Sequence, residues 1–239
     1  MGAMTCVVGR VAELWHYPVK SMGGQQLTEL RCGSRGIDGD RWWAVRGADG
    51  KLGSGKTSRR FRRMPGLLSM AAFTDDHGVA WIRSPGGESG RIDDLMTAAL
   101  VGAVVGEDVT LVEEGEMSHF DDAPLHLVSS ASLRWLEARR PADQVDRRRF
   151  RPNLVVECEG ADLVEEGWLG RQLQIGGVTL AIEGLTERCV MTTLAQDDLG
   201  FAPAILGDLH KANESRLGVY ASVVSEGTIR LEDDVALCP

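Results

Sequence analysis

Short aliphatic and β-branched segments, each bounded by Gly, Asp or Glu, run through the whole chain and limit it to a β-rich fold. Segments this short suit strands, because an amphipathic helix needs a longer run with a period of about 3.6 residues. A Gly176-Gly177 pair between two such segments predicts a β-hairpin. The predicted strands cover residues 7–15, 26–31, 41–45, 68–73, 79–82, 109–112, 125–128, 154–157, 173–175, 178–182, 220–224 and 229–231.

Helical patterns are few. Residues 93–101 start with acids, and Gly102 is placed to end the helix. Residues 130–140 follow a capping Ser129 and stop before Pro141, and a third pattern covers residues 206–217. Helices this scattered do not alternate regularly with strands. We therefore predict a mostly β fold with a few helices (α+β), built around a β-barrel.

The length of 239 residues allows one large domain or two small ones. Because no long linker divides the chain, two domains would pack closely, and the acidic stretch 113–124 is the expected junction. No apolar run approaches the roughly 20 residues that span a bilayer. The N-terminus also lacks the pattern of a secretory signal peptide. We expect a cytoplasmic protein without a membrane partner.

The formal net charge of −9 argues against nucleic-acid binding, which needs a dominant positive face. Two basic runs interrupt this acidic background. The first runs from Lys56 to Arg63 and the second from Arg147 to Arg151. From the residues alone, each run is either part of a local anion site or a solvated surface.

Part of the first basic run satisfies the Walker A pattern, with Gly50, Gly55, Lys56 and Thr57 in register. A phosphate-binding loop of this kind needs a buried strand leading into it and a helix starting at the lysine. Here a turn-forming segment precedes the lysine and a basic run follows it. We therefore predict that the match is fortuitous, and a nucleotide hydrolase is the weakest of three functional alternatives.

Four groups of polar residues end or follow predicted strands, where loops can present them to a cleft. They are Tyr17-Pro18-Val19-Lys20-Ser21, Gly36-Ile37-Asp38-Gly39-Asp40-Arg41, Arg149-Phe150-Arg151-Pro152-Asn153 and Thr186-Glu187-Arg188-Cys189-Val190-Met191-Thr192-Thr193.

Cys189 differs from the other cysteines, which are Cys6, Cys32, Cys158 and Cys238. It lies in a polar loop beside Arg188, and a neighbouring cation favours the thiolate of a cysteine. A buried, inert thiol is the alternative that local sequence leaves open.

In this order, the four groups resemble the motifs of the MOSC family, named after the C-terminal domain of molybdenum-cofactor sulfurase. The resemblance is to two-part members such as the mitochondrial amidoxime-reducing component and its bacterial counterparts. It implies an N-terminal β domain over residues 1–118 and a MOSC barrel over residues 119–239. The stretch from Asp122 to Ser129 looks like a further family motif.

The resemblance implies a molybdenum cofactor whose metal is bound by Cys189, the implied catalytic residue. It further implies an oxidoreductase that reduces N-hydroxylated or N-oxygenated small molecules. Some relatives carry an iron–sulfur domain with clustered cysteines, but this sequence shows no such cluster, so a separate protein would deliver electrons. A non-catalytic carrier of cofactor or sulfur is the main alternative. The implied cofactor contacts are Lys20, Ser21, Arg41, Thr57, Arg59, Arg60, Ser129, Arg149, Arg151, Asn153 and Arg188.

Overall fold

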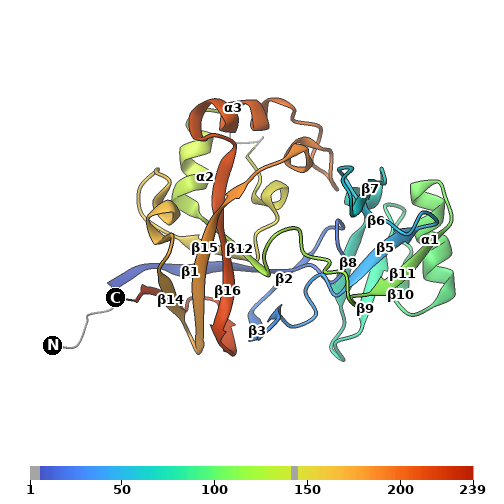
Figure 1. The fold of residues 1–239 in the computed structure, drawn as a ribbon, viewed down its shortest axis with the longest axis horizontal. Helices are drawn as coiled ribbons and strands as arrows, with labels where there is room; N and C mark the ends of the chain where they lie inside the picture. Colours follow the sequence, from blue (N-terminus) through green and yellow to red (C-terminus); the bar gives the residue numbers. More distant parts are fainter. Residues whose placement is uncertain (1–5, 141–144, 239) are drawn as a thin grey trace.

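The computed structural model describes residues 6–140 and 145–238. A seven-stranded barrel dominates it, drawn at the left of Figure 1. The barrel strands are β1 (Cys6–His16), β12 (Leu125–Ser129), β13 (Leu154–Glu157), β14 (Gln172–Ile175), β15 (Val178–Glu187), β16 (Arg216–Ser225) and β18 (Asp234–Leu237). The predicted mostly β fold with a barrel is therefore confirmed.

The barrel closes because β1 pairs with both β18 and β13, in the order β13-β12-β16-β15-β14-β18-β1. All neighbouring strands are antiparallel except β12 and β13, which are joined through α2 (Ser130–Glu137). Alternate residues of β15, such as Val178, Leu180 and Ile182, are buried in the barrel core. This alternation is what a strand with one face on a core requires.

A second group of elements lies at the right of Figure 1 and supplies the other wall of the site. One sheet has the order β11-β5-β6-β7 and another the order β10-β9-β8. Their bounds are β5 (Trp43–Gly47), β6 (Leu52–Ser54), β7 (Phe61–Arg63), β8 (Ala71–Thr74), β9 (Ala80–Arg83), β10 (Ser89–Arg91) and β11 (Val109–Glu113), with α1 (Leu95–Val105) alongside.

The remaining elements are short. β2 (Gln25–Leu27) extends the barrel sheet beyond β1, and β17 pairs with β3 and β4 in a small sheet. The helix α3 packs above the barrel beside α2 (Figure 1). The bounds are β3 (Glu29–Gly33), β4 (Gly36–Ile37), β17 (Gly227–Arg230), η1 (Leu67–Ser69), η3 (Arg147–Phe150), η4 (Val164–Trp168), η5 (Val190–Thr193) and α3 (Ala204–Asn213).

Several predicted boundaries are wrong for identifiable reasons. α1 continues past Gly102 and ends at Gly106, whose left-handed φ of 82° suits a C-cap. The predicted helix 206–217 stops at Asn213, because the following residues pair in β16 and complete the barrel. The predicted strand 26–31 is split at Thr28 into β2 and β3, which join different sheets.

Other segments also differ from the predictions. Residues 68 and 69 of the predicted strand 68–73 belong to η1. The predicted strands do not include β4, β6, β7, β10 and β18. The helix predicted over 130–140 ends at Glu137, and Pro141, its expected stop, lies outside the described residues. The hairpin at Gly176-Gly177 is confirmed, with Ile175 paired to Val178.

The predicted division after residue 118 falls in the connection between β11 and β12. It stays a prediction. The topology adds that β1, although N-terminal in sequence, is a strand of the barrel. The two parts of the chain are therefore joined by a shared strand as well as by the connection at residues 114–124. No helix in the two described stretches is long and apolar enough to cross a membrane.

Candidate functional site

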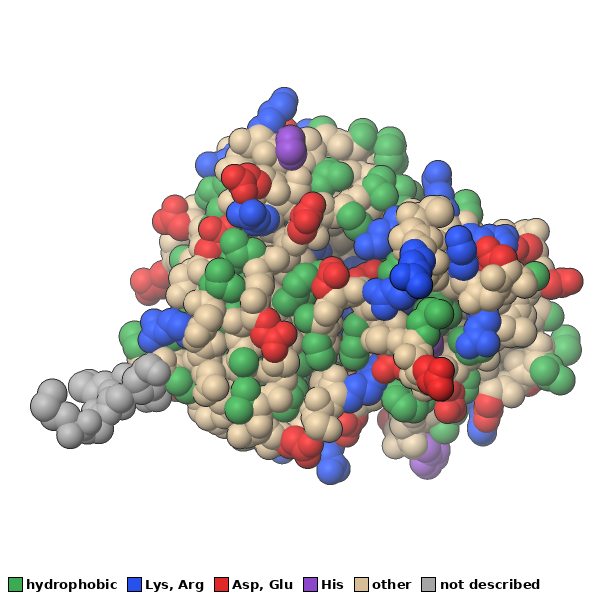
Figure 2. Space-filling view, in the orientation of Figure 1, with side chains coloured by type: hydrophobic (Ala, Val, Ile, Leu, Met, Phe, Trp, Pro, Cys, Tyr) green, Lys and Arg blue, Asp and Glu red, His purple; other side chains and the backbone are tan. Residues whose placement is uncertain are grey.

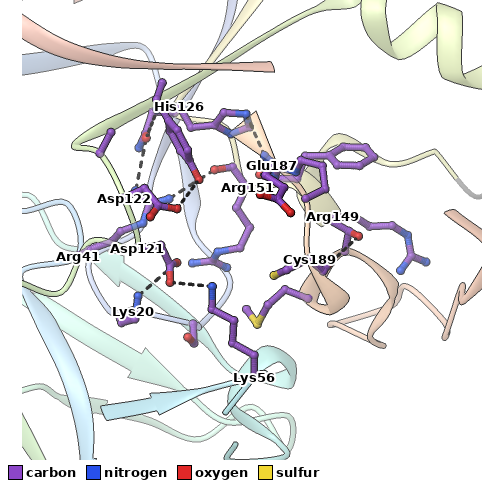
Figure 3. Close-up of a pocket in the computed structure, with 18 residues that line it drawn as sticks. Lys20, Arg41, Lys56, Asp121, Asp122, His126, Arg149, Arg151, Glu187 and Cys189 are labelled. Atoms are coloured by element: carbon purple, nitrogen blue, oxygen red, sulfur yellow. Dashed lines mark hydrogen bonds and ion pairs between the residues drawn. The ribbon is translucent and has the colours of Figure 1, made fainter. Parts of the chain in front are cut away.

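A cavity lies where the barrel meets the β5–β7 sheet, and its walls come from segments far apart in sequence (Figure 3). Figure 2 shows Lys and Arg side chains gathered where the barrel and the β5–β7 sheet meet. The residues that line the cavity are Lys20, Ser21, Arg41, Lys56, Asp121, Asp122, Ala123, His126, Arg149, Phe150, Arg151, Asn153, Glu187, Arg188, Cys189, Met191, Thr192 and Tyr220.

Cys189 stands at the point where β15 ends and η5 begins, and its thiol is directed into the cavity (Figure 3). Its side chain is partly exposed. The carbonyl of Cys189 accepts hydrogen bonds from the backbone N and the Oγ1 of Thr192, at 3.1 and 3.0 Å. These bonds fix the loop that presents the thiol. Cys189 is therefore not the buried thiol of the alternative prediction.

The connection between β6 and β7 also contacts the loop that carries Cys189. The backbone N of Gly55 lies 3.1 Å from Sδ of Met191. A Cβ at position 55 would lie 2.4 Å from the same sulfur, so a larger residue would require the Met191 side chain to shift. The segment with the Walker-like pattern therefore packs against the Cys189 loop.

Arg188 also lines the cavity, and its guanidinium contacts His126 and the residue before Arg151. Its Nη1 lies 3.1 Å from Nε2 of His126, and its Nη2 donates to the carbonyl of Phe150. Burial, and then the charge of Arg188, lower the pKa of His126 well below its usual value. The imidazole is therefore neutral and accepts the hydrogen bond from the guanidinium.

Arg151 adopts a left-handed φ of 52°, which turns its side chain from the end of η3 toward the cavity. Its guanidinium stacks on the ring of Tyr17 at 4.3 Å, and Nη1 donates to the carbonyl of Met22. Its Nη2 is buried and has no hydrogen-bond partner in the described residues. Burial lowers the pKa of Arg151 to about 10, so the group stays charged at neutral pH.

Arg41 forms an ion pair with the fully buried Asp40, and its guanidinium lies 4.9 Å from the centre of the Tyr17 ring. Burial opposes the charge, but Asp40 outweighs it and the pKa of Arg41 is raised. Asn153 supports the arrangement, since its Oδ1 accepts from Arg41 Nη1 at 3.4 Å and from the backbone N of His126 at 3.2 Å.

Two lysines share one carboxylate at the mouth of the cavity. Asp121 lies 3.3 Å from Nζ of the buried Lys20 and 3.4 Å from Nζ of Lys56 (Figure 3). Burial lowers the pKa of Lys20 to about 8, although Asp121 opposes the shift. Burial opposes the charge of Asp121, but Lys20 and Lys56 outweigh it and lower its pKa to about 2.

The cavity therefore carries an excess of positive charge in an acidic protein. Six of its lining residues are cationic and three are acidic. Even without Arg149, whose guanidinium is directed away, and Arg41, which is paired with Asp40, the cations outnumber the acids. The acids do not cancel the cations one for one, because Asp121 already serves two lysines and Asp122 contacts the hydroxyl of Tyr220 at 3.4 Å. An anionic ligand would complete the electrostatics of this site.

The structure brings most of the predicted contacts to this cavity: Lys20, Ser21, Arg41, Arg149, Arg151, Asn153, Arg188 and Cys189. Arg149 is a special case, because its guanidinium is directed away from the cavity in Figure 3. It donates to the carbonyls of Leu194 and Gly200, at 3.2 and 2.7 Å. Arg149 thus holds the segment that follows the Cys189 loop.

The other predicted contacts lie elsewhere. Ser129 caps α2 and donates to the buried Glu165 behind the cavity. Arg59 and Arg60 line an adjoining groove that shares Lys56 with the cavity. Thr57 is exposed, and its Oγ1 accepts from the backbone N of Arg63 at 3.4 Å.

Sequence reasoning missed several lining residues as contacts, namely Lys56, Asp121, Asp122, His126 and Tyr220. A signal existed for the middle three, which fall in the Asp122–Ser129 motif or next to it. Lys56 belongs to the Walker A pattern and is not among the predicted cofactor contacts. No helix follows that lysine, since the chain continues into β7, so the geometry of a nucleotide-hydrolysing loop is lacking.

The other thiols lack such surroundings. Cys32 and Cys158 are buried, and burial raises the pKa of each to about 12. Within residues 6–140 and 145–238, no group of three His, Cys, Asp or Glu side chains is placed to hold a metal ion.

Two domain-family models match the chain. Residues 8–120 match the MOSC N-terminal beta barrel domain, and residues 114–236 match the MOSC domain. The chain is 26% identical to the "Mitochondrial amidoxime reducing component 2" of Rattus norvegicus, over 80% of this chain and 68% of that one. It is 28% identical to the "Mitochondrial amidoxime-reducing component 1" of Homo sapiens, over 80% and 67%.

Among solved structures, the YUAD protein from Bacillus subtilis superposes with a TM-score of 0.47 and 14% identity, covering 98% of each chain. The two matching domains together extend from residue 8 to residue 236 and meet at the connection that borders the cavity. The chain therefore belongs to the MOSC domain family.

Proposed function

We propose that this protein is a molybdenum-cofactor-dependent reductase of N-hydroxylated or N-oxygenated small molecules, supplied with electrons by a separate protein. The similarity to proteins named as amidoxime-reducing components supports the reaction class. The observation that carries the proposal is the position of Cys189, a soft donor facing a cavity with excess positive charge. We also propose a cytoplasmic location.

The residues present fit this cofactor. A thiolate suits molybdenum, and the phosphate of the pterin needs cationic partners. The buried Nη2 of Arg151 and Nε of Arg188 have no hydrogen-bond partner among the described residues, as expected where a ligand completes the site. Cys189 would bind the metal, and Lys20, Arg41 and Arg151 would hold the anionic part. When bound, the cofactor supplies the two-electron redox chemistry.

The remaining residues of the cavity position these contacts. Thr192 fixes the Cys189 loop, and Asn153 orients Arg41. Neutral His126 receives the hydrogen bond of Arg188 and so holds this guanidinium against the barrel. Asp121 keeps the ammonium groups of Lys20 and Lys56 at the mouth of the cavity, where both remain available to an anion.

The test is to express the chain in a host that makes the cofactor and to measure bound molybdenum by mass spectrometry. We expect about one molybdenum per chain in the wild type. Cys189→Ala should lose most of it, whereas the matched control Cys158→Ala should keep it, because Cys158 is buried away from the cavity. Equal molybdenum in both variants would contradict the proposed ligand.

Turnover separates the reductase from the carrier alternative. Loaded protein with reduced viologen as artificial donor should convert a hydroxylamine or amidoxime to the corresponding amine or amidine. Stoichiometric molybdenum without any turnover would favour a carrier. Magnesium-dependent nucleotide binding that is lost in Lys56→Ala would instead support the nucleotide hydrolase.

A further inference from the structure

A second, more enclosed cavity of about 170 Å³ shares Arg151 with the Cys189 cavity and otherwise has different walls among the described residues. It is formed by the end of β1, by residues 68–71 and by the loop that follows η5. In this loop, the backbone N of Asp197 donates to the carbonyl of Leu68 at 3.2 Å. The cavity therefore lies at a contact between the two parts of the chain.

Three of its lining side chains have a buried polar atom without a hydrogen-bond partner in the described residues. These atoms are Oη of Tyr17, Nη2 of Arg151 and Nε2 of Gln196. Tyr17 is only 2% exposed and Gln196 only 7%. Buried polar groups are normally paired, so three unpaired groups around one cavity indicate a missing partner. All three can donate a hydrogen bond, which indicates that the partner is an acceptor.

The charges around this cavity point the same way. Asp197 is the one acid among the described lining residues, and it pairs with Arg148, which also pairs with Asp146 and Asp198. Arg151 and Arg83 have no carboxylate partner within the described stretches. Burial holds the pKa of Tyr17 well above its usual value, so the phenol keeps its proton. A buried cation next to neutral donors is an environment that favours an anion.

We propose that this cavity is a second anion site, which binds a small oxyanion such as phosphate or sulfate between Tyr17, Arg151 and Gln196. A volume of about 170 Å³ has room for roughly five water-sized molecules, enough for a tetrahedral ion with some water. Such an ion would tie the loop after η5 to the end of β1. It would also fix Arg151, which faces both cavities. The site does not require the proposed reductase function, although it shares Arg151 with the proposed cofactor site.

The test is titration of the full chain with inorganic phosphate by isothermal calorimetry, with chloride keeping the ionic strength constant. We expect saturable binding of one phosphate per chain and competition by sulfate. Tyr17→Phe keeps the ring that stacks on Arg151 and removes the hydroxyl, and Gln196→Met removes the amide. Each should weaken binding roughly tenfold, the effect of losing one hydrogen bond to a charged ligand.

Lys56→Gln is the matched control, because Lys56 lines the Cys189 cavity and not the second one. It should change the phosphate affinity less than twofold. The proposal is overturned if wild-type protein shows no saturable binding, or if Lys56→Gln abolishes binding while folded Tyr17→Phe and Gln196→Met retain it. Because molybdenum content is measured separately, failure here leaves the reductase proposal intact, and failure of that proposal leaves this one intact.

Discussion

The two basic runs look alike in the sequence, but the second places its key cation deep in the site whereas the first reaches only its mouth. In the second run, Arg147 pairs with Glu13 and Arg148 with Asp146, so their charges are locally compensated. Arg149 and Arg151 have no carboxylate partner among the described residues. Arg149 instead donates to two backbone carbonyls, whereas Nη2 of Arg151 is buried and has no hydrogen-bond partner there. In the first run, Arg62 pairs with Glu107, and Lys56 shares Asp121 with Lys20.

Arginines that are neighbours in one basic run have different contacts in the tertiary structure and therefore different roles. Partnered arginines such as Arg147 neutralise nearby carboxylates, and Arg149 holds backbone carbonyls of a loop. Arg151, whose buried Nη2 has no hydrogen-bond partner among the described residues, is the member most available to a ligand. Substitutions within one run should therefore have very unequal effects.

The largest effect should come from Arg151. Arg151→Gln removes the uncompensated charge from both cavities, and we expect molybdenum retained on purification to fall at least tenfold, as measured by mass spectrometry. Arg151→Lys should recover part of it, because the charge remains while the planar fork is lost. If folded Arg151→Gln retains as much molybdenum as the wild type, Arg151 does not contribute more to cofactor binding than the neighbouring arginines.

The next largest effect should be on stability and should come from Lys20. This lysine shares the carboxylate of Asp121 with Lys56 of the first basic run. The pKa of Lys20 is lowered from 10.5 to about 8 in the folded protein. Between these pH values the unfolded chain holds the proton and the folded chain has released it, so stability rises with pH. We expect the free energy of unfolding to increase by about 3 kcal/mol from pH 8 to pH 10.5 relative to Lys20→Met.

The measurement is urea unfolding of both proteins across this pH range. Lys20→Met is the appropriate reference because it keeps the length and the apolar stem of the side chain. Parallel pH profiles for wild type and Lys20→Met would show that the buried ammonium does not carry the predicted penalty.

Arg149 should affect stability more than the cofactor. Arg149→Met leaves the carbonyls of Leu194 and Gly200 without their donor, and we expect a loss of about 2 kcal/mol in chemical denaturation. Molybdenum retained per folded chain should fall less than in Arg151→Gln. The reverse ranking would mean that Arg149, although turned away, serves the ligand directly.

Arg147 should have the smallest effect. Its side chain is 43% exposed and its partner is Glu13, so Arg147→Gln should cost less than about 1 kcal/mol. Thermal unfolding and molybdenum content should both stay close to wild type. A loss as large as that of Arg151→Gln would show that the whole run acts as one charge cluster.

The fold class and most strands could be predicted, because alternation of apolar and polar residues is a local property that survives in the barrel, as in Val178–Glu187. Boundaries failed where distant pairing decided the outcome. Leu217 reads as the end of a helix in isolation, but it is a buried residue of β16 within the barrel wall. Likewise, Gly102 reads as a stop although α1 tolerates it.

The site could be predicted in part. The motifs brought forward Cys189, Arg151 and Lys20, which the structure places around one cavity. Ser129 was grouped with them by its motif, yet its hydroxyl faces Glu165 and caps α2. Lys56 was not predicted as a contact, because the Walker A pattern assigns this lysine to an unrelated nucleotide site.

By itself, the sequence determined where most of the barrel strands lie, which thiol lies in a polar loop, and that positive charge is concentrated in two runs. These are properties of neighbouring residues. Only the tertiary structure decided which cations remain uncompensated, because the partners of Arg147, Arg149 and Lys56 come from segments distant in the chain. It also decided that Arg151, through its left-handed backbone and its stack on Tyr17, lies between two cavities.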